Sequence, residues 1–326
     1  MGGRKIVLLL VNLLALIPMA ATALGAETFP SKPLELIVPY AAGGSTDVMA
    51  RTLTARAAPF LNNQPCLVVN KTGAATMAAS RYVLEAKSDG YTLYSISSSS
   101  MMITPALNRA QYSWRDFTGI AQTMIGSSAL YVKADSPLNT LEKFIEYAKQ
   151  NPGKIKYTSP GAGSQEHLAM EGLAVLKGIL IKHIPTKGDA EAITALMGGH
   201  VLCAAGSPIA YAPHVSGGTV ICLVQFGTQR DPVILPNAPT FKEQGVDLSI
   251  DLWRWIAVRK NTPPDRVKIL ATAFKNILHD KATLASLEKI QSWVSYQPPE
   301  EYERIMKESE AATTPLIKAS KILEAK

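Results

Sequence analysis

Short apolar segments alternate with amphipathic segments along most of the chain, in two blocks. In the first block, residues 34–39, 65–70 and 91–97 are expected to form strands, with helices over 46–60 and 75–86 between them. Such strand–helix alternation predicts a mostly parallel sheet with helices on both faces. Because a second block follows further along the chain, the sequence predicts an α/β protein of two lobes.

The second block opens with a helix that is expected to start at Asn139, with Glu142 as its capping partner, and to stop at residues 151–153. A later helix is expected from the proline pair at 263–264. Further strands are expected over 156–159, 182–185, 201–205 and 220–226.

The first residues predict export. Arg4 and Lys5 precede an apolar run over 6–19, and small residues follow, which is typical of a signal peptide cleaved near residues 23–26. The run is too short and too interrupted for a spanning helix. We therefore expect a periplasmic protein. Lys and Arg total 33 against 26 Asp and Glu, but no basic stretch carries interleaved aromatics, so we expect no nucleic-acid partner.

Two loops rich in small residues carry the functional signal. Residues 40–47 (YAAGGSTD) follow the first strand and residues 159–167 (SPGAGSQEH) follow a strand of the second block, and each loop opens a helix. Ligands of parallel sheets bind beyond the carboxyl ends of the strands, and a helix amino end favours an anion. One such loop in each lobe predicts a cleft for a carboxylate-bearing molecule.

Enzyme and cofactor signals are weak. The sequence holds no G-x-S-x-G elbow, no phosphate-binding loop and no complete dinucleotide fingerprint. A secreted hydrolase using Ser164 and His167 is the best enzymatic rival, but residues three apart at a helix start do not form an oriented relay. The five histidines lack metal-ligand spacing, so neither a metal nor a cofactor is expected. The odd cysteine count (Cys66, Cys203, Cys222) predicts at least one free thiol or an intermolecular bridge.

A family resemblance enters with the run FPSKPLELIVPYAAGGSTDVMAR at 29–51. Further segments follow in the same order: DGYTL at 89–93, NPGKIKY at 151–157, SPGAGS at 159–164 with HLA at 167–169, PTKG at 185–188, GGHV at 198–201, Arg230 with LPNAPT at 235–240, WR at 253–254 and TPP at 262–264. These motifs resemble the Bug family, the extracytoplasmic solute receptors of tripartite tricarboxylate transporters. The match covers essentially the whole chain after the signal peptide.

The resemblance implies a two-lobed type II periplasmic-binding-protein fold with the ligand cleft between the lobes. It implies a signal peptide over 1–25, a first lobe built from 26–123 and 251–326, and a second lobe over 124–250, joined by crossing segments near 119–131 and 250–258. It also implies a monomer that holds a small carboxylate and meets membrane permease subunits. The expected ligand-binding residues are Tyr40, Gly44, Ser45, Thr46, Asp47, Ser98, Ser99, Ser159, Gly161, Gly163, Ser164, Lys187, Ser207 and Arg254.

Several of these residues have an alternative structural explanation. Asp47 is also placed to cap its helix, Lys187 to be a solvated loop charge, and Arg254 to pair with Asp251. A sensory role, in which the liganded receptor contacts a membrane histidine kinase, fits the same sequence as transport does.

Three positions depart from the family pattern. Gly206 and Ser207 stand where many members have an Asp-Asn pair, which argues against an amino-acid ligand. Trp255 stands where a glycine is common, so we expect it to narrow the pocket or stack on a ligand ring. Thr186 replaces a common tyrosine. Together they favour a carboxylate without an amino group, either aromatic or with two or three carboxyl groups.

Overall fold

The computed structural model describes residues 28–186 and 188–319. The predicted signal peptide and Lys187 therefore lie outside the described residues. Within these ranges no helix combines the length and the apolar character that crossing a bilayer requires.

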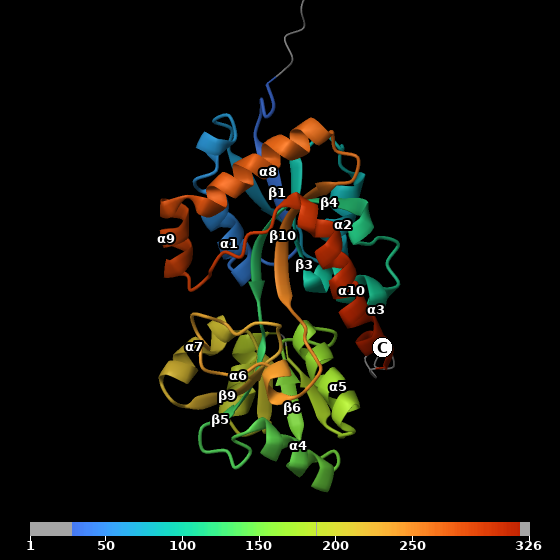
Figure 1. Ribbon diagram of the computed structural model, residues 1–326, viewed down its shortest axis with the longest axis vertical. Coiled ribbons are helices and arrows are strands. Elements are labelled where there is room, and N and C mark those ends of the chain that lie inside the picture. Colours follow the sequence, from blue (N-terminus) through green and yellow to red (C-terminus); the bar gives the residue numbers. More distant parts are fainter. Residues whose placement is uncertain (1–27, 187, 320–326) are drawn as a thin grey trace, which may run out of the picture.

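The chain folds into two five-stranded sheets that lie one above the other (Figure 1). The first sheet has the order β2-β1-β3-β10-β4 and the second β7-β6-β8-β5-β9. In each sheet three neighbouring strands are parallel, and the fourth strand runs antiparallel to both of its neighbours. The strands are β1 Leu34–Val38, β2 Cys66–Asn70, β3 Thr92–Ser97, β4 Phe117–Gly126, β5 Ala129–Lys133, β6 Lys156–Ser159, β7 Lys182–Pro185, β8 Cys203–Gly206, β9 Val220–Gln225 and β10 Leu252–Arg259. We call the sheets with their helices the first and the second lobe, and the two-lobed α/β prediction is confirmed.

Helices cover both sheets. The first lobe carries α1 Ser45–Thr54, α2 Met77–Glu85, α3 Thr104–Asn108, α8 Pro264–His279, α9 Lys281–Lys289 and α10 Tyr302–Ala319, and the second carries α4 Leu141–Gln150, α5 Gln165–Lys177, α6 Asp189–Met197 and α7 Pro208–Ser216. Short helical turns lie at Ala58–Phe60, Ala74–Thr76, Ser99–Ile103 (η3), Trp114–Asp116, Lys242–Gln244 and Pro299–Glu301 (η6).

Two helix boundaries differ from the prediction. The helix expected over 46–60 ends at Thr54, and only a short turn follows it. Thr140, not Asn139, caps α4, because the Thr140 hydroxyl accepts the backbone N–H of Lys143. The Asn139 side chain instead accepts from the Lys143 ammonium. The carboxylate of Glu142 lies in the first turn, where the helix dipole favours it.

The chain passes between the lobes at two places. Strand β4 of the first sheet leads through Ser127 and Ser128 into β5 of the second. The return runs through Ile250 and Asp251 into β10, which pairs with β4 along its whole length. Figure 1 shows β4 and β10 side by side where they approach the second lobe. The two connections therefore lie next to each other.

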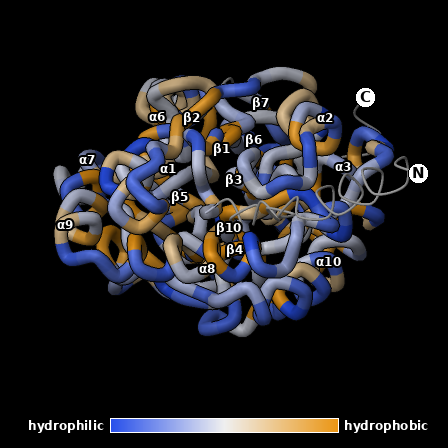
Figure 2. Tube along the Cα trace, turned by 90° about the horizontal axis from the view of Figure 1, so that it is seen from above, coloured by the Kyte–Doolittle hydropathy of each residue, from blue (hydrophilic) through white to orange (hydrophobic). Residues whose placement is uncertain are grey.

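Helix α10 covers one face of β10 and extends the apolar core between the lobes. Trp253 and Trp255 are almost fully buried, and Trp255 packs edge-on against Tyr302 of α10. Further along α10, Leu316 lies against Gly172 of α5 in the second lobe. In Figure 2 the hydrophobic segments concentrate in the central strands, with hydrophilic segments outside them. One apolar cluster thus reaches from the first sheet through α10 to the second lobe.

Candidate functional site

The glycine loop of the first lobe is held by the carboxylate of Asp47. Gly43 has a φ of +81°, and its N–H donates to Asp47 Oδ2 at 2.8 Å. Arg51 pairs with the same carboxylate at 3.0 Å, and the side-chain amide of Asn70 donates to it at 2.8 Å. These contacts, with Arg51 first, lower the pKa of Asp47 to about 2. The Asp47 carboxylate is therefore engaged in fixing the start of α1.

The glycine loop of the second lobe is held in the same manner by an imidazole. Gly163 has a φ of +77°, and its N–H donates to Nδ1 of His167 at 3.0 Å. The ring of His167 stacks on His183 with centroids 3.8 Å apart. Burial, followed by the neighbouring His183, lowers the pKa of His167 to about 3. The ring is thus neutral, and since Nδ1 accepts, its proton lies on Nε2.

The hydroxyl of Ser164 caps α5. It accepts the backbone N–H of His167 at 3.1 Å and donates to Ser159 Oγ at 3.3 Å. The His167 ring bonds Gly163 rather than this hydroxyl. The relay that a serine hydrolase at these residues would need is therefore not assembled.

Arg254 is a buried cation beside the first loop. Its side chain comes from β10, and the residue is only 8% exposed. Nε donates to the hydroxyl of Thr46 and Nη2 to that of Ser45, both at 3.2 Å, while Nη1 approaches Met124 Sδ at 2.8 Å. Burial lowers the pKa of this guanidinium. Within the described residues it has no ion pair, since Asp251, its predicted alternative partner, accepts from Thr228.

The loop of the second lobe lies against the first lobe, near the first loop. Ser98, after β3, donates to Gln165 at the start of α5 at 2.9 Å. A Cβ added to Gly163 would lie 2.7 Å from Leu107 of α3. Glu166 accepts the Ser128 hydroxyl at 2.6 Å and lies close enough to Arg254 to offset part of the fall in its pKa. We call this region, where the loops of residues 40–47 and 159–167 approach each other, the interlobe site.

An acid that the sequence reasoning missed lies beside Gly206. A Cβ at Gly206 would stand 2.6 Å from Oδ1 of Asp189, so this carboxyl occupies the room that a side chain there would need. The backbone N–H of Ser207 donates to the same oxygen at 3.2 Å. Burial and the neighbouring Glu166 raise the pKa of Asp189 to about 7. A carboxyl thus lies beside 206–207 although neither residue is acidic, and it comes from the start of α6, directly after the PTKG motif.

The other predicted residues are described by their local contacts and their places in the elements. Tyr40 bonds Ser97 Oγ at 2.8 Å, and burial raises its pKa. The Ser159 hydroxyl, which donates to Gly161 O, also bonds His183 Nε2 at 2.8 Å. Gly44 is the N-cap of α1 and Ser99 the first residue of η3. Gln165, Glu166 and Ser128 were missed, although the first two follow Ser164 directly.

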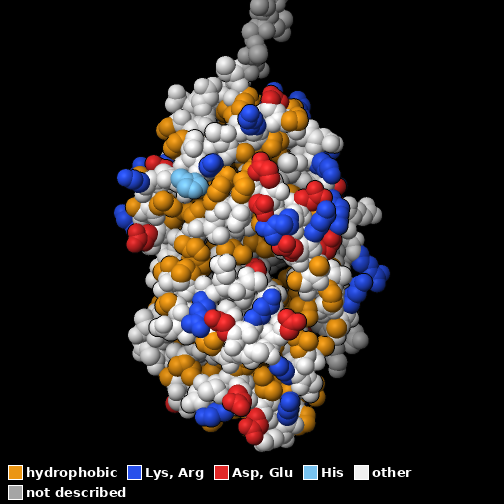
Figure 3. Space-filling model, viewed as in Figure 1, with side chains coloured by type: hydrophobic (Ala, Val, Ile, Leu, Met, Phe, Trp, Pro, Cys, Tyr) orange, Lys and Arg blue, Asp and Glu red, His pale blue; other side chains and the backbone are white. Residues whose placement is uncertain are grey.

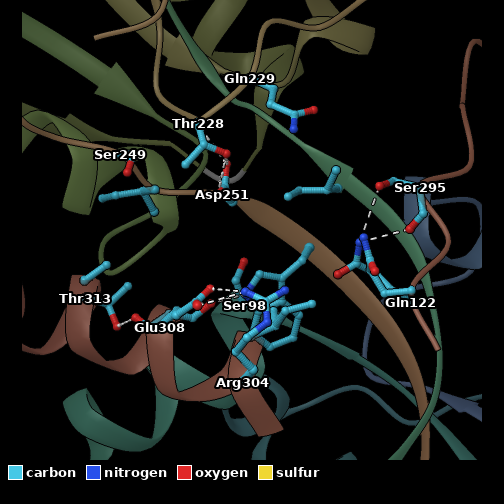
Figure 4. Close-up of a pocket in the computed structure, with 17 residues that line it drawn as sticks. Ser98, Gln122, Thr228, Gln229, Ser249, Asp251, Ser295, Arg304, Glu308 and Thr313 are labelled. Carbon is cyan, nitrogen blue, oxygen red and sulfur yellow. Dashed lines mark hydrogen bonds and ion pairs between the residues drawn. The ribbon is translucent and has the colours of Figure 1, made fainter. Parts of the chain in front are cut away.

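A polar pocket of about 310 Å³ lies on the opposite face of β10, and the predicted site residue Ser98 lines it (Figure 4). Trp253 lines it, whereas the adjacent Arg254 points to the interlobe site, as expected for successive residues of a strand. The prediction that Trp255 narrows the ligand pocket is wrong. Residues two apart in a strand share a face, so Trp255 packs with Trp253 toward α10.

Comparisons with known proteins agree with one another. The model of the tripartite tricarboxylate transporter family receptor matches residues 49–322. A UPF0065 protein from the gbd 5′ region of Cupriavidus necator is 35% identical, covering 91% of this chain and 89% of its own. BugT of Bordetella pertussis is 29% identical, covering 81% and 82%.

Solved structures show the same fold. A TctC solute-binding protein from Polaromonas, without ligand, has a TM-score of 0.79 at 33% identity and covers 89% of this chain and 99% of its own. MatC of Rhodopseudomonas palustris, with bound malate, has a TM-score of 0.74 at 25% identity, covering 89% and 100%. The R. palustris protein Rpa4515, solved with adipate, has a TM-score of 0.73 at 25% identity, covering 89% and 97%.

Proposed function

The chain belongs to the tripartite tricarboxylate transporter receptor family, and from that premise we propose that it captures a small carboxylate in the periplasm for membrane permease subunits. The names of its relatives support this role, since the two R. palustris proteins hold malate and adipate. A binding protein needs a site that attracts the ligand and a way to enclose it, and each requirement has a counterpart in the fold.

Arg254 is the observation that carries the proposal. A buried cation is costly unless an anion or several hydrogen bonds compensate it. Among the described residues its hydrogen-bond partners are two hydroxyls and a thioether, and both hydroxyls belong to the first turn of α1. A ligand carboxylate beside Arg254 would supply the missing negative charge and accept from the remaining N–H groups. The positive end of the α1 dipole adds to this attraction.

We propose that the second lobe contacts the ligand from the opposite side. Ser164, Gly161 and Ser159 lie in its glycine loop, and Gln165 already bonds Ser98 across the lobe boundary. Because a ligand that contacts both lobes binds their closed arrangement better, binding shifts the population toward it. We propose that the two lobes turn about the adjacent connections at 127–128 and 250–251.

The proposed ligand lacks an amino group. With a pKa near 7, Asp189 is largely uncharged in mildly acidic medium, and its carboxylic acid can then donate to a second carboxylate but gives little attraction to an ammonium. Aromatic monocarboxylates and di- or tricarboxylates are the classes to test. We expect aspartate and glutamate to bind no better than millimolar; micromolar affinity for either would refute this part of the proposal.

A ligand screen tests the function. The mature protein is heated with mono-, di- and tricarboxylates, because a ligand that binds only the folded state raises the melting temperature. Titration calorimetry then confirms each hit. We expect at least one carboxylate to stabilise the wild type and to fail with Arg254→Met. If no carboxylate of the screen stabilises the wild type, the proposal is wrong.

A further inference from the structure

The pocket on the α10 side of β10 adjoins the interlobe site, because Ser98, which bonds Gln165 there, also lines this pocket. Its walls come from strands β4 and β10, from the second-lobe segments 228–229 and 249–251, and from α10. Its volume of about 310 Å³ is at the lower end of the usual range for small-molecule pockets, which is about 300–1,000 Å³. Figure 3 shows basic and acidic side chains intermixed over α10 on this side of the molecule. A molecule in this pocket would touch both lobes behind their connections.

One wall of this pocket carries a buried acceptor without a partner. Gln122 of β4 is 1% exposed, and its Nε2 donates to the backbone oxygen of Ser295 at 2.9 Å. Its Oε1 has no hydrogen-bond partner among the described residues. Figure 4 shows the side chain on the pocket wall beside Ser295. A buried acceptor left unpaired costs about 1–3 kcal/mol, so this oxygen indicates an occupant that donates a hydrogen bond.

The rest of the lining offers both donors and acceptors. Asp251 is an acceptor on the second-lobe side, held in place by the backbone N–H of Thr228 at 2.7 Å. Arg304 of α10 is a donor, oriented by its bonds to Glu308 at 2.8 Å. Hydroxyls of the lining belong to Ser249, Ser309 and Thr313 among others. An ammonium can only donate and a carboxylate can only accept, whereas a hydroxyl group does both.

We propose that this pocket binds a small polyhydroxylated molecule, of the size of a polyol or a single sugar ring, through a hydroxyl that donates to Oε1 of Gln122. Other hydroxyls of the occupant face Asp251 and Arg304. The apolar side chains of Ile125, Ile305 and Ala312 line the pocket too and suit the carbon skeleton of such a molecule. This site does not depend on the carboxylate function proposed for the interlobe site.

Saturation-transfer NMR on the mature protein tests the proposal, with xylitol, glucose and myo-inositol as probes at millimolar concentration. This method is chosen because polyols at high concentration raise melting temperatures without specific binding. Ala312→Trp places a ring at the pocket rim on an exposed position of α10, and Ala311→Trp, exposed but outside the lining, is the matched control. Gln122→Met removes the acceptor.

We expect at least one probe to bind the wild type and Ala311→Trp, and Ala312→Trp to lose the signal. Gln122→Met should weaken binding about tenfold, as loss of one neutral hydrogen bond implies. Circular dichroism checks that each variant folds. If none of the three probes binds the wild type, or if binding survives Ala312→Trp, the proposal is wrong. Carboxylate binding in the same samples is read separately, so failure here leaves the interlobe proposal intact.

Discussion

The two glycine loops have the same backbone design and opposite chemistry. In each, a glycine with positive φ donates its N–H to the side chain four residues later, Gly43 to Asp47 and Gly163 to His167. The first loop closes on a carboxylate that is paired with Arg51, and the second on a neutral imidazole. The same turn can therefore be stabilised by either group, provided that an acceptor faces the glycine N–H.

The surroundings of the two loops differ in charge. The buried guanidinium of Arg254 adjoins the first loop, whereas Glu166 and Asp189 lie by the second. A carboxylate is therefore expected to sit on the first lobe, and the second lobe to contribute hydroxyls, amides and backbone groups. We therefore expect the lobe with the cation to determine which ligands bind and the other lobe to enclose them.

Removing the charge of the first lobe should have the largest effect. Truncating one partner of a buried charge pair costs about 2–5 kcal/mol, so Arg254→Met should weaken carboxylate binding at least thirtyfold. Titration calorimetry with a ligand from the screen measures this. Arg230→Met, which removes an exposed pair with Glu243, is the control and should leave affinity unchanged. Equal losses in both variants would contradict the role of Arg254.

Alanine substitutions at the two equivalent glycines should affect ligand binding differently. Both positions have positive φ, so each substitution costs about 1–2 kcal/mol of backbone strain. A Cβ at Gly43 meets nothing within 4 Å, whereas one at Gly163 would lie 2.7 Å from Leu107. Gly163→Ala should therefore also weaken ligand binding by obstructing closure, and Leu107→Ala should restore it. If Gly43→Ala weakens binding as much, the contact with Leu107 is not what matters.

The two loops should also lose stability at different pH. The pKa of Asp47 is lowered from 3.8 to about 2, so its contribution is complete above pH 3.8 and is lost as the pH falls toward 2. The pKa of His167 is lowered from 6.5 to about 3, so its contribution begins to fall already below pH 6.5.

Denaturation of His167→Asn between pH 6.5 and 4 measures this difference. Asn Oδ1 can accept from Gly163 but does not titrate, so stability should decline less with acidification than in the wild type. The free energy of unfolding should change with pH less steeply in this variant than in the wild type, by at most about 1.4 kcal/mol per pH unit. Asp47→Asn, the companion variant, should keep the wild-type slope over this range. The idea fails if both variants show the same slope.

The smallest effect is expected at the N-caps. Ser164→Ala removes the hydroxyl that caps α5 and should lower the free energy of unfolding by about 1 kcal/mol. It should also weaken ligand binding if this hydroxyl contacts the ligand, as we propose for the loop of residues 159–164. At the equivalent first-lobe position, Gly44, alanine removes no capping hydrogen bond, but it is a poorer N-cap than glycine and its Cβ would lie 3.3 Å from Ala41 O, so Gly44→Ala should lower stability as well. Urea denaturation that shows no loss for Ser164→Ala would contradict the capping role.

Local patterns predicted the strands and the positions of both loops, because alternation and small-residue runs are readable along the chain. Contacts between residues that are far apart in the sequence could not be predicted from such local patterns. Arg254 could equally have paired with Asp251, and only the fold shows Thr228 taking that carboxylate. Asp189 was missed because it lies at the start of helix α6, and only the fold brings its carboxyl beside Gly206 at the end of strand β8. The ligand-binding roles of the predicted residues remain predictions.

A crystal structure with a carboxylate found in the screen tests the central claim most directly. We expect one carboxylate group of the ligand within hydrogen-bond distance of the Arg254 guanidinium and of the first turn of α1, with at least one further contact from the loop of residues 159–164. A ligand that contacts only one lobe, or that binds away from Arg254, would contradict the account.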